Sequence, residues 1–162
     1  MRIFYLFFIF ILLSCSSAKV YTDYDNKIDF STYTSFDYFL SDKTCLSQLD
    51  EKRIKNALER ALAKKNITKK TIPDFSINFY AEVYTVETEN SIGVGLGTGG
   101  GSVGGGVSGG IPIRTEKEMI ALTVEFVDAL TKELFWQGVV ETRMKDTKNP
   151  TEREAFINEL II

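Results

Sequence analysis

The chain has 162 residues, of which 44% are hydrophobic and 25% are charged, a composition typical of one globular domain with its own core. Its formal net charge of −3 and the lack of a dense basic stripe argue against nucleic acid as a partner. The chain contains no histidine, which is the commonest general base and the commonest metal ligand in proteins. We therefore expect no catalytic, cofactor or metal site.

The N-terminal segment has the pattern of a secretory signal peptide. Arg2 precedes an apolar run from residue 3 to residue 13, which is too short to span a bilayer as a helix of about 20 residues. The run ends in Leu12-Leu13-Ser14-Cys15, which is similar to a bacterial lipobox, whose cysteine is acylated and becomes the mature N-terminus. The sequence thus predicts a signal peptide over residues 1–14 and a lipid on Cys15. An ordinary signal peptide that is cut elsewhere is the alternative.

The residues after Cys15 indicate where an anchored protein would reside. No acidic residue follows the cysteine, and by resemblance to proteobacterial sorting this favours the outer membrane, facing the periplasm. Residues 15–19 form a short tether, because four extended residues reach at most ~14 Å. Residues 20–162 are therefore expected to form a single domain close to the membrane surface. If Cys15 carries lipid, Cys45 has no internal disulfide partner, and we expect it to be a partly buried apolar residue.

The first half of the domain is predicted to contain two strands and a helix. Val20–Tyr24 alternates and is rich in strand-forming residues, and Thr34–Leu40 is the second predicted strand. Ser47, with Asp50 three residues later, favours the start of a helix. Six apolar residues at helical spacing then form one stripe: Leu49, Ile54, Ala57, Leu58, Ala61 and Leu62.

The second half is predicted to contain three strands and a second helix. Alternation predicts strands over Phe75–Tyr84, Ile120–Phe126 and Leu134–Thr142. Asn149 followed by Pro150 favours a helix start. Trp136 is predicted to lie in the core or at its edge, packed against Phe126 or the helices, and not to serve as a ligand platform.

These elements together predict an α+β fold. Their order is β-β-α-β-(Gly-rich loop)-β-β-α, and strands joined by short turns favour antiparallel pairing. We expect an antiparallel sheet of about five strands with both helices packed on one face.

Residues 90–113 form the most unusual segment, because eleven of the twelve glycines fall between Gly93 and Gly110. The spacing Gly95-x-Gly97-x-x-Gly100 matches a dinucleotide fingerprint, but no helix is predicted to follow it. Glycines at every fourth position from residue 93 to residue 109 could instead form a glycine zipper in a membrane. The favoured interpretation is a long mobile hairpin loop, since glycine disfavours a helix.

Two groups of charged residues are candidate sites. Three acidic residues, Asp23, Asp25 and Asp29, resemble part of a calcium loop, but the pattern lacks an oxygen ligand at Lys27 and a glycine at Ile28. They are predicted to cap turns by accepting backbone hydrogen bonds. Four lysines could contact anionic headgroups, although solvated positions near a helix end are favoured: Lys64, Lys65, Lys69 and Lys70.

Several short motifs recur in the same order in one known family. They are Asp23-Tyr24-Asp25, Asp29-Phe30-Ser31-x-Tyr33, Pro73-Asp74-Phe75, Leu134-Phe135-Trp136-Gln137-Gly138 after Asp128, and Glu152-Arg153 in the late helix. The chain thus resembles the bacterial lipoprotein family catalogued as domain of unknown function 4136. The resemblance implies a lipoprotein with an α+β domain and no assigned catalytic residues.

The sequence favours a non-catalytic lipoprotein of the cell envelope. Its partners would be the membrane, through the lipid on Cys15, and a protein or lipid ligand beside that membrane. One alternative is a membrane-active or partner-binding protein that acts through a zipper over residues 93–109. A more remote alternative is an enzyme with a histidine-free site.

Overall fold

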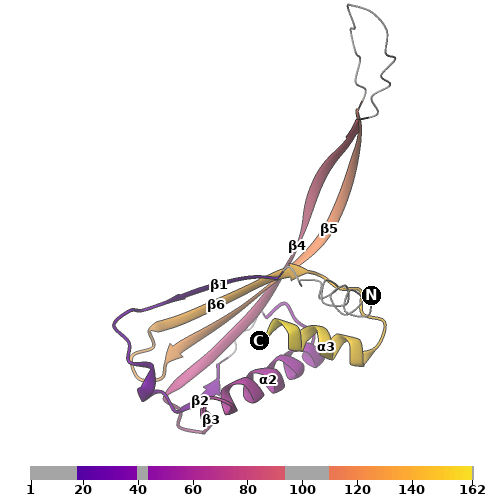
Figure 1. The fold of residues 1–162 in the computed structure, drawn as a ribbon. Coiled ribbons are helices and arrows are strands. Elements are labelled where there is room, and N and C mark those ends of the chain that lie inside the picture. The colour runs from indigo at the N-terminus through magenta and orange to yellow at the C-terminus, as the bar shows by residue number, and fades with distance from the viewer. Residues whose placement is uncertain (1–17, 40–43, 94–109, 162) are drawn as a thin grey trace, which may run out of the picture.

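A six-stranded mixed sheet with two helices on one face forms the body of the protein (Figure 1). The computed structural model describes residues 18–39, 44–93 and 110–161. The order of strands across the sheet is β1-β6-β5-β4-β2-β3. In chain order the strands are β1 (Lys19–Tyr24), β2 (Ser35–Tyr38), β3 (Thr68–Lys69), β4 (Phe75–Gly93), β5 (Gly110–Asp128) and β6 (Leu134–Arg143).

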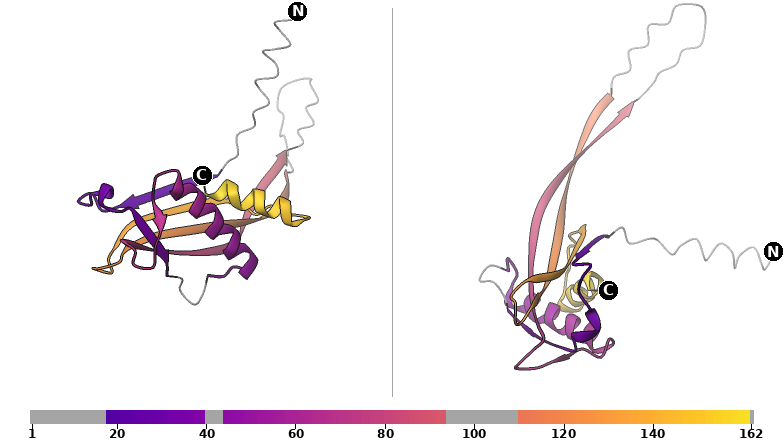
Figure 2. Two further views of the ribbon diagram at one scale, coloured as in Figure 1. Left: turned by 90° about the horizontal axis from the view of Figure 1, so that it is seen from below. Right: turned by 90° about the vertical axis from the view of Figure 1, so that its left-hand side faces the viewer.

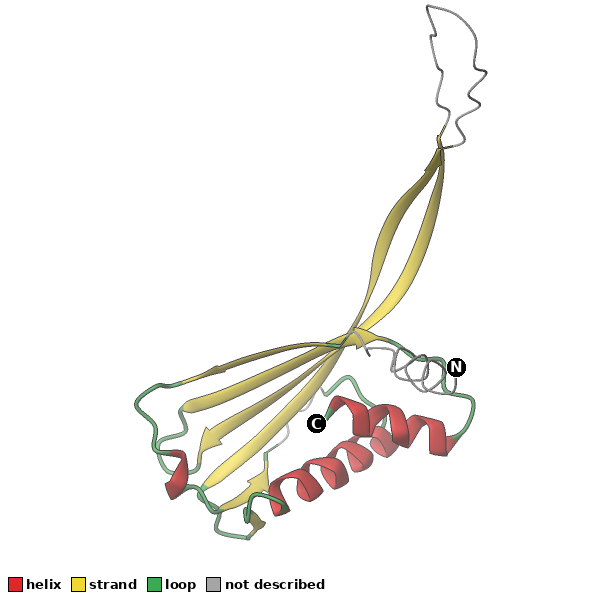
Figure 3. Ribbon diagram, in the orientation of Figure 1, coloured by secondary structure: helices red, strands yellow, loops and turns green. Residues whose placement is uncertain are grey.

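The predicted antiparallel sheet of about five strands is wrong in two respects. Strand β2 pairs in parallel with β4, and the sixth strand, β3, pairs in parallel with β2. Parallel neighbours need a crossover connection, and the helix between β2 and β4 supplies it. Strand β3 has only two residues, so it is too short to show an alternating pattern. The remaining pairs are antiparallel, and the prediction that both helices lie on one face is confirmed (Figure 3).

Both helices begin where their capping residues predict. Helix α2 (Gln48–Ala63) has Ser47 as its N-cap, whose hydroxyl accepts a hydrogen bond from the Asp50 amide. Helix α3 (Pro150–Leu160) has Asn149 as its N-cap, whose side chain accepts from the Glu152 amide. The apolar stripe of α2 is buried except for Leu49, which is 66% exposed, and Ala61 at its edge.

The core lies between these helices and the middle of the sheet. Four residues of β4 that face the helices are at most 1% exposed: Phe75, Ile77, Phe79 and Ala81. Phe135 packs against Phe75 and stacks on Tyr33, at 4.4 Å between ring centroids. Cys45, in contrast, is exposed, which corrects the expectation of a partly buried residue. Its φ of 56° places it in a turn immediately before α2.

Strands β4 and β5 continue far beyond the sheet as a projecting hairpin (Figure 2). Residues 90–93 and 110–113 were expected to be loop, but they pair as strand up to Gly93 and Gly110. Backbone pairing therefore continues past the last residue that packs on the core. Residues 94–109, which carry most of the glycine positions, lie outside the described residues, and Gly93 itself ends a strand and not a helix.

Candidate ligand-binding groove

An apolar groove of about 310 Å³ lies between the β1–β6 side of the sheet and the C-terminal parts of both helices. Its lining comes from five separated parts of the chain, represented by Val20 of β1, Leu62 of α2, Val124 of β5, Trp136 of β6 and Leu160 of α3. The groove is thus a concave, mainly apolar surface, and its volume is at the small end of the range of volumes of ligand-binding sites.

Trp136 forms one wall of this groove. Its indole stacks on Phe126 with 4.5 Å between ring centroids, and it is only partly buried. The predicted position at the core edge is therefore confirmed. The same ring also lines the groove, and the expectation that it is not a ligand platform stays a prediction.

Gly138, two residues along β6, allows the indole to take this position. A Cβ atom at Gly138 would lie 2.5 Å from the Trp136 Cη2 atom, closer than real Cβ contacts. The indole therefore lies directly over the glycine backbone. A glycine inside a strand often marks such a close approach, and this was the one sequence signal that could have indicated the groove.

Strand β1 leaves part of the groove exposed. Val20 is 64% exposed although it lines an apolar surface, and Val140, its partner on β6, is partly buried. In contrast, Leu58 and Leu62 on the helix side are at most 8% exposed. The helices thus cover the middle of the sheet fully and its β1–β6 side incompletely.

Cationic side chains lie beside the apolar lining. Lys65 lines the groove, and together with Arg60 and Lys64 it also lines an adjoining hollow of about 360 Å³. The Arg60 guanidinium donates to the Asn158 side chain at 2.6 Å. Within the described ranges, no carboxylate forms an ion pair with Lys64 or Lys65. This end of the groove therefore carries positive charge that no carboxylate of the described residues balances.

The other candidate lysines lie elsewhere. Lys69 is 3.8 Å from Asp37 and 3.6 Å from Glu59, and its ammonium lies 5.0 Å from the centroid of the Tyr38 ring. Lys70 is exposed and lines neither hollow. The structure thus places only Lys64 and Lys65, of the four lysines, beside the groove.

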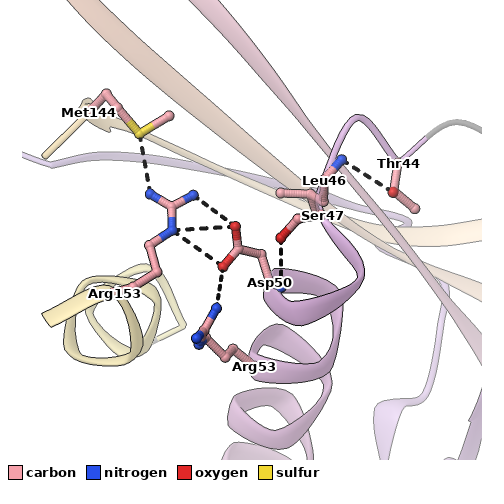
Figure 4. Close-up of polar contacts among 7 residues, drawn as sticks. All are labelled: Thr44, Leu46, Ser47, Asp50, Arg53, Met144 and Arg153. Carbon is pink, nitrogen blue, oxygen red and sulfur yellow. Dashed lines mark hydrogen bonds and ion pairs between the residues drawn. The ribbon is translucent and has the colours of Figure 1, made fainter. Parts of the chain in front are cut away.

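The most buried charged cluster is a closed structural contact (Figure 4). The Asp50 carboxylate accepts from Arg53 at 2.8 Å and from Arg153 of α3 at 3.0 and 3.3 Å. Burial acts to raise the pKa of Asp50, but Arg153, with help from Arg53 and Ser47, outweighs it and lowers that pKa. Because each charge already has its partners, the cluster joins α2 to α3 and leaves no free group for a ligand.

Two further carboxylates, Asp74 and Asp128, are engaged in hydrogen bonds that join separate segments of the chain. Asp74 Oδ2 accepts from the Thr34 and Ser35 amides, both at 2.9 Å, and these bonds, the Thr34 amide first, lower the pKa of Asp74. Asp128 accepts from the Tyr33 hydroxyl at 2.8 Å, and burial together with this bond raises the pKa of Tyr33 to about 12. Neither carboxylate is available as a free general base.

Of the three acidic residues near the N-terminus, Asp25 and Asp29 cap turns as predicted, whereas Asp23 lies within β1. Asp23, Asp25 and Asp29 each accept a hydrogen bond from a backbone amide one or two residues later. Among the described residues no group of three potential metal ligands occurs, and no helix is long and apolar enough to cross a membrane. Cys15 lies outside the described residues.

Comparison with known proteins identifies a family. A family model described as "Domain of unknown function (DUF4136)" matches residues 20–161 and confirms the resemblance drawn from the short motifs. No curated protein is significantly similar to the chain.

Solved structures show weaker likenesses. A PDZ domain protein from Parabacteroides distasonis is 13% identical, with a TM-score of 0.47 over 94% of this chain and 38% of that protein. The PelC dodecamer from Paraburkholderia phytofirmans is 9% identical, with a TM-score of 0.42 over 90% of this chain and 93% of that protein. The chain thus spans well under half the length of the first of these proteins.

Proposed function

The chain belongs to the DUF4136 family, and on this premise we propose that it is a non-catalytic, lipid-anchored binding protein of the bacterial cell envelope. The anchor is a lipid on Cys15, the membrane is the outer membrane, and the domain faces the periplasm. The binding site is the groove between β1–β6 and the two helices.

The groove is the observation that carries this proposal. Its wall includes β1, which begins at Lys19, four residues after Cys15. Four extended residues reach at most ~14 Å, so a lipid on Cys15 would hold the groove close to the headgroups. A site in this position suits a ligand that comes from, or remains near, the membrane.

The chemistry of the groove supports binding over catalysis. Its lining is mainly aliphatic and aromatic, which excludes water and provides shape. The described carboxylates that have lowered pKa values accept backbone or side-chain hydrogen bonds outside the groove, or belong to the Asp50 cluster. An acid–base pair would need two titratable groups that converge on one substrate.

Fractionation of cells tests the anchor. Cys15→Ser should remain unprocessed precursor, whereas Cys45→Ser, at the other cysteine of the chain, should be processed and membrane-associated like the wild type. Normal processing of Cys15→Ser and its release as a soluble protein would contradict the anchor.

Photo-crosslinking in intact cells tests the site. A photoreactive residue at Val140, inside the groove, is compared with one at Val139, whose side chain points to the opposite face of β6. The proposal predicts capture from position 140 and not from position 139. Capture from position 139 alone would place the binding surface on the other face of the sheet.

A further inference from the structure

We infer that the groove binds an anionic amphiphile with a single acyl chain, such as a fatty acid, with the chain in the groove and the acidic headgroup at Lys64 and Lys65. This inference rests on the proposed function and adds the class of ligand. It follows from two features that adjoin each other, the apolar groove and a cationic rim whose lysines have no ion pair among the described residues.

The apolar groove extends along β6. Along β6 its lining runs from Trp136 through Gly138 to Val140, four residue steps or about 13 Å of strand. The indole of Trp136 occupies the space that a side chain at position 138 would need, so Gly138 adds no side chain to this surface. A volume of about 310 Å³ along such a surface suits one flexible chain better than a bulky ring system.

The cationic rim supplies the complement to an acidic headgroup. Lys65 belongs to both the groove and the adjoining hollow, which Arg60 and Lys64 also line. Neither Lys64 nor Lys65 forms an ion pair with a carboxylate of the described chain. A carboxylate or phosphate at this rim would therefore meet lysines whose charge no described carboxylate balances, while the chain remains in the apolar groove.

The two lysines also favour an anionic amphiphile over a neutral lipid. A neutral lipid would fill the groove but would gain nothing from the two lysines. An anionic ligand without an acyl chain would meet the lysines but would leave Trp136 and Val140 unfilled. Only an anionic amphiphile uses both features, and each feature can be removed separately.

Quenching of Trp136 fluorescence provides the test, because Trp136 is the one tryptophan of the chain. The mature protein in phosphatidylcholine vesicles is titrated with dibromostearate, whose bromines quench indoles in contact with the chain. We expect saturable quenching, with weaker binding of the methyl ester. Shorter brominated acids should bind about fourfold more weakly for each methylene that is lost.

Matched variants test whether the cationic rim contributes to binding. Lys65→Glu should weaken dibromostearate binding several-fold and reduce its advantage over the methyl ester. Lys52→Glu, at an exposed lysine of α2, should leave both unchanged. Because both positions are exposed, neither variant depends on an altered core.

Three results would overturn the inference. The first is quenching that rises without saturation, which is expected if the acid simply partitions into the vesicles. The second is equal binding of the acid and its methyl ester, and the third is equal binding by Lys65→Glu and the wild type. The quenching measurement does not depend on the lipid anchor. If the processed chain proves to be soluble, it is titrated with dibromostearate in the same way without vesicles. Failure of the Cys15 prediction and failure of the ligand prediction therefore remain distinguishable.

Discussion

The two helices meet the rest of the molecule in two contrasting ways. At the start of α2, Asp50 lies between Arg53 and Arg153, and each charge has its partner. At the end of α2, apolar side chains and Lys65 border a groove that remains open toward β1. In the first contact every charged group has a partner, whereas the second leaves apolar surface exposed and a lysine without an ion pair among the described residues. This difference separates a structural cluster from a candidate site.

The contrast predicts the largest loss of stability at the contact between Asp50 and its two arginines. Asp50→Ala leaves Arg53 and Arg153 without their shared carboxylate and should lower the free energy of unfolding by about 3 kcal/mol. The exposed pair of Lys69 with Glu59 provides the control, and Glu59→Gln should cost under about 1 kcal/mol. Urea denaturation measures both. Equal effects would mean that the Asp50 cluster is no more important than a surface pair.

A smaller loss is expected where the groove is formed. Gly138→Val places a branched side chain against the Trp136 ring and should cost about 1–3 kcal/mol through overpacking. The indole should shift away from Phe126, which a changed Trp136 emission spectrum would report. An unchanged spectrum and unchanged stability would show that the indole does not lie over Gly138.

Acid should weaken the contact between Asp50 and its two arginines. Because the pKa of Asp50 is lowered in the folded state, its contribution is present above the ordinary value of 3.8 and is lost as the pH falls through the lowered value. Asp74 and Asp128 contribute in the same direction. The unfolding free energy of Asp50→Asn should therefore fall less steeply below pH 3.8 than that of the wild type. Parallel curves would exclude Asp50 as a source of this acid sensitivity.

The projecting hairpin should contribute least to the stability of the body. Val83 is 54% and Val86 is 41% exposed, although Ala81 on the same strand is 1% exposed. Replacement of residues 87–116 by Asn-Gly keeps the pair Val86–Lys117 next to a short turn. The melting temperature of this shortened protein should stay within a few degrees of that of the wild type. A large decrease would show that the removed segment packs on the body.

Local sequence signals predicted the elements well and their partners less well. Ser47 and Asn149 marked both helix starts, because capping depends on residues a few positions apart. The parallel pair of β2 and β4 was missed, although the helix between them is the connection that such a pair requires. Alternation indicates which face of a strand is buried, but it does not indicate which strand lies beside it.

The groove could not be predicted from any one segment. Val20, Leu62, Trp136 and Leu160 come from four elements and become neighbours only after folding. Each of them alone resembles an ordinary core residue. The sequence indicated Lys64 and Lys65 among four candidate lysines. Only the fold shows that these two lie beside the groove, whereas Lys69 lies near the carboxylates of Asp37 and Glu59.

Native mass spectrometry of protein taken directly from its membranes tests the central claim, that the groove holds a ligand. The account predicts an added noncovalent mass on the wild type and on Val139→Asp, its loss from Val140→Asp, and a smaller ligand-bound fraction for Lys65→Glu. The Lys65 variant guards against a folding defect caused by a charge at Val140. A mass equal to the processed chain alone, or the same added mass on all four proteins, would contradict the account.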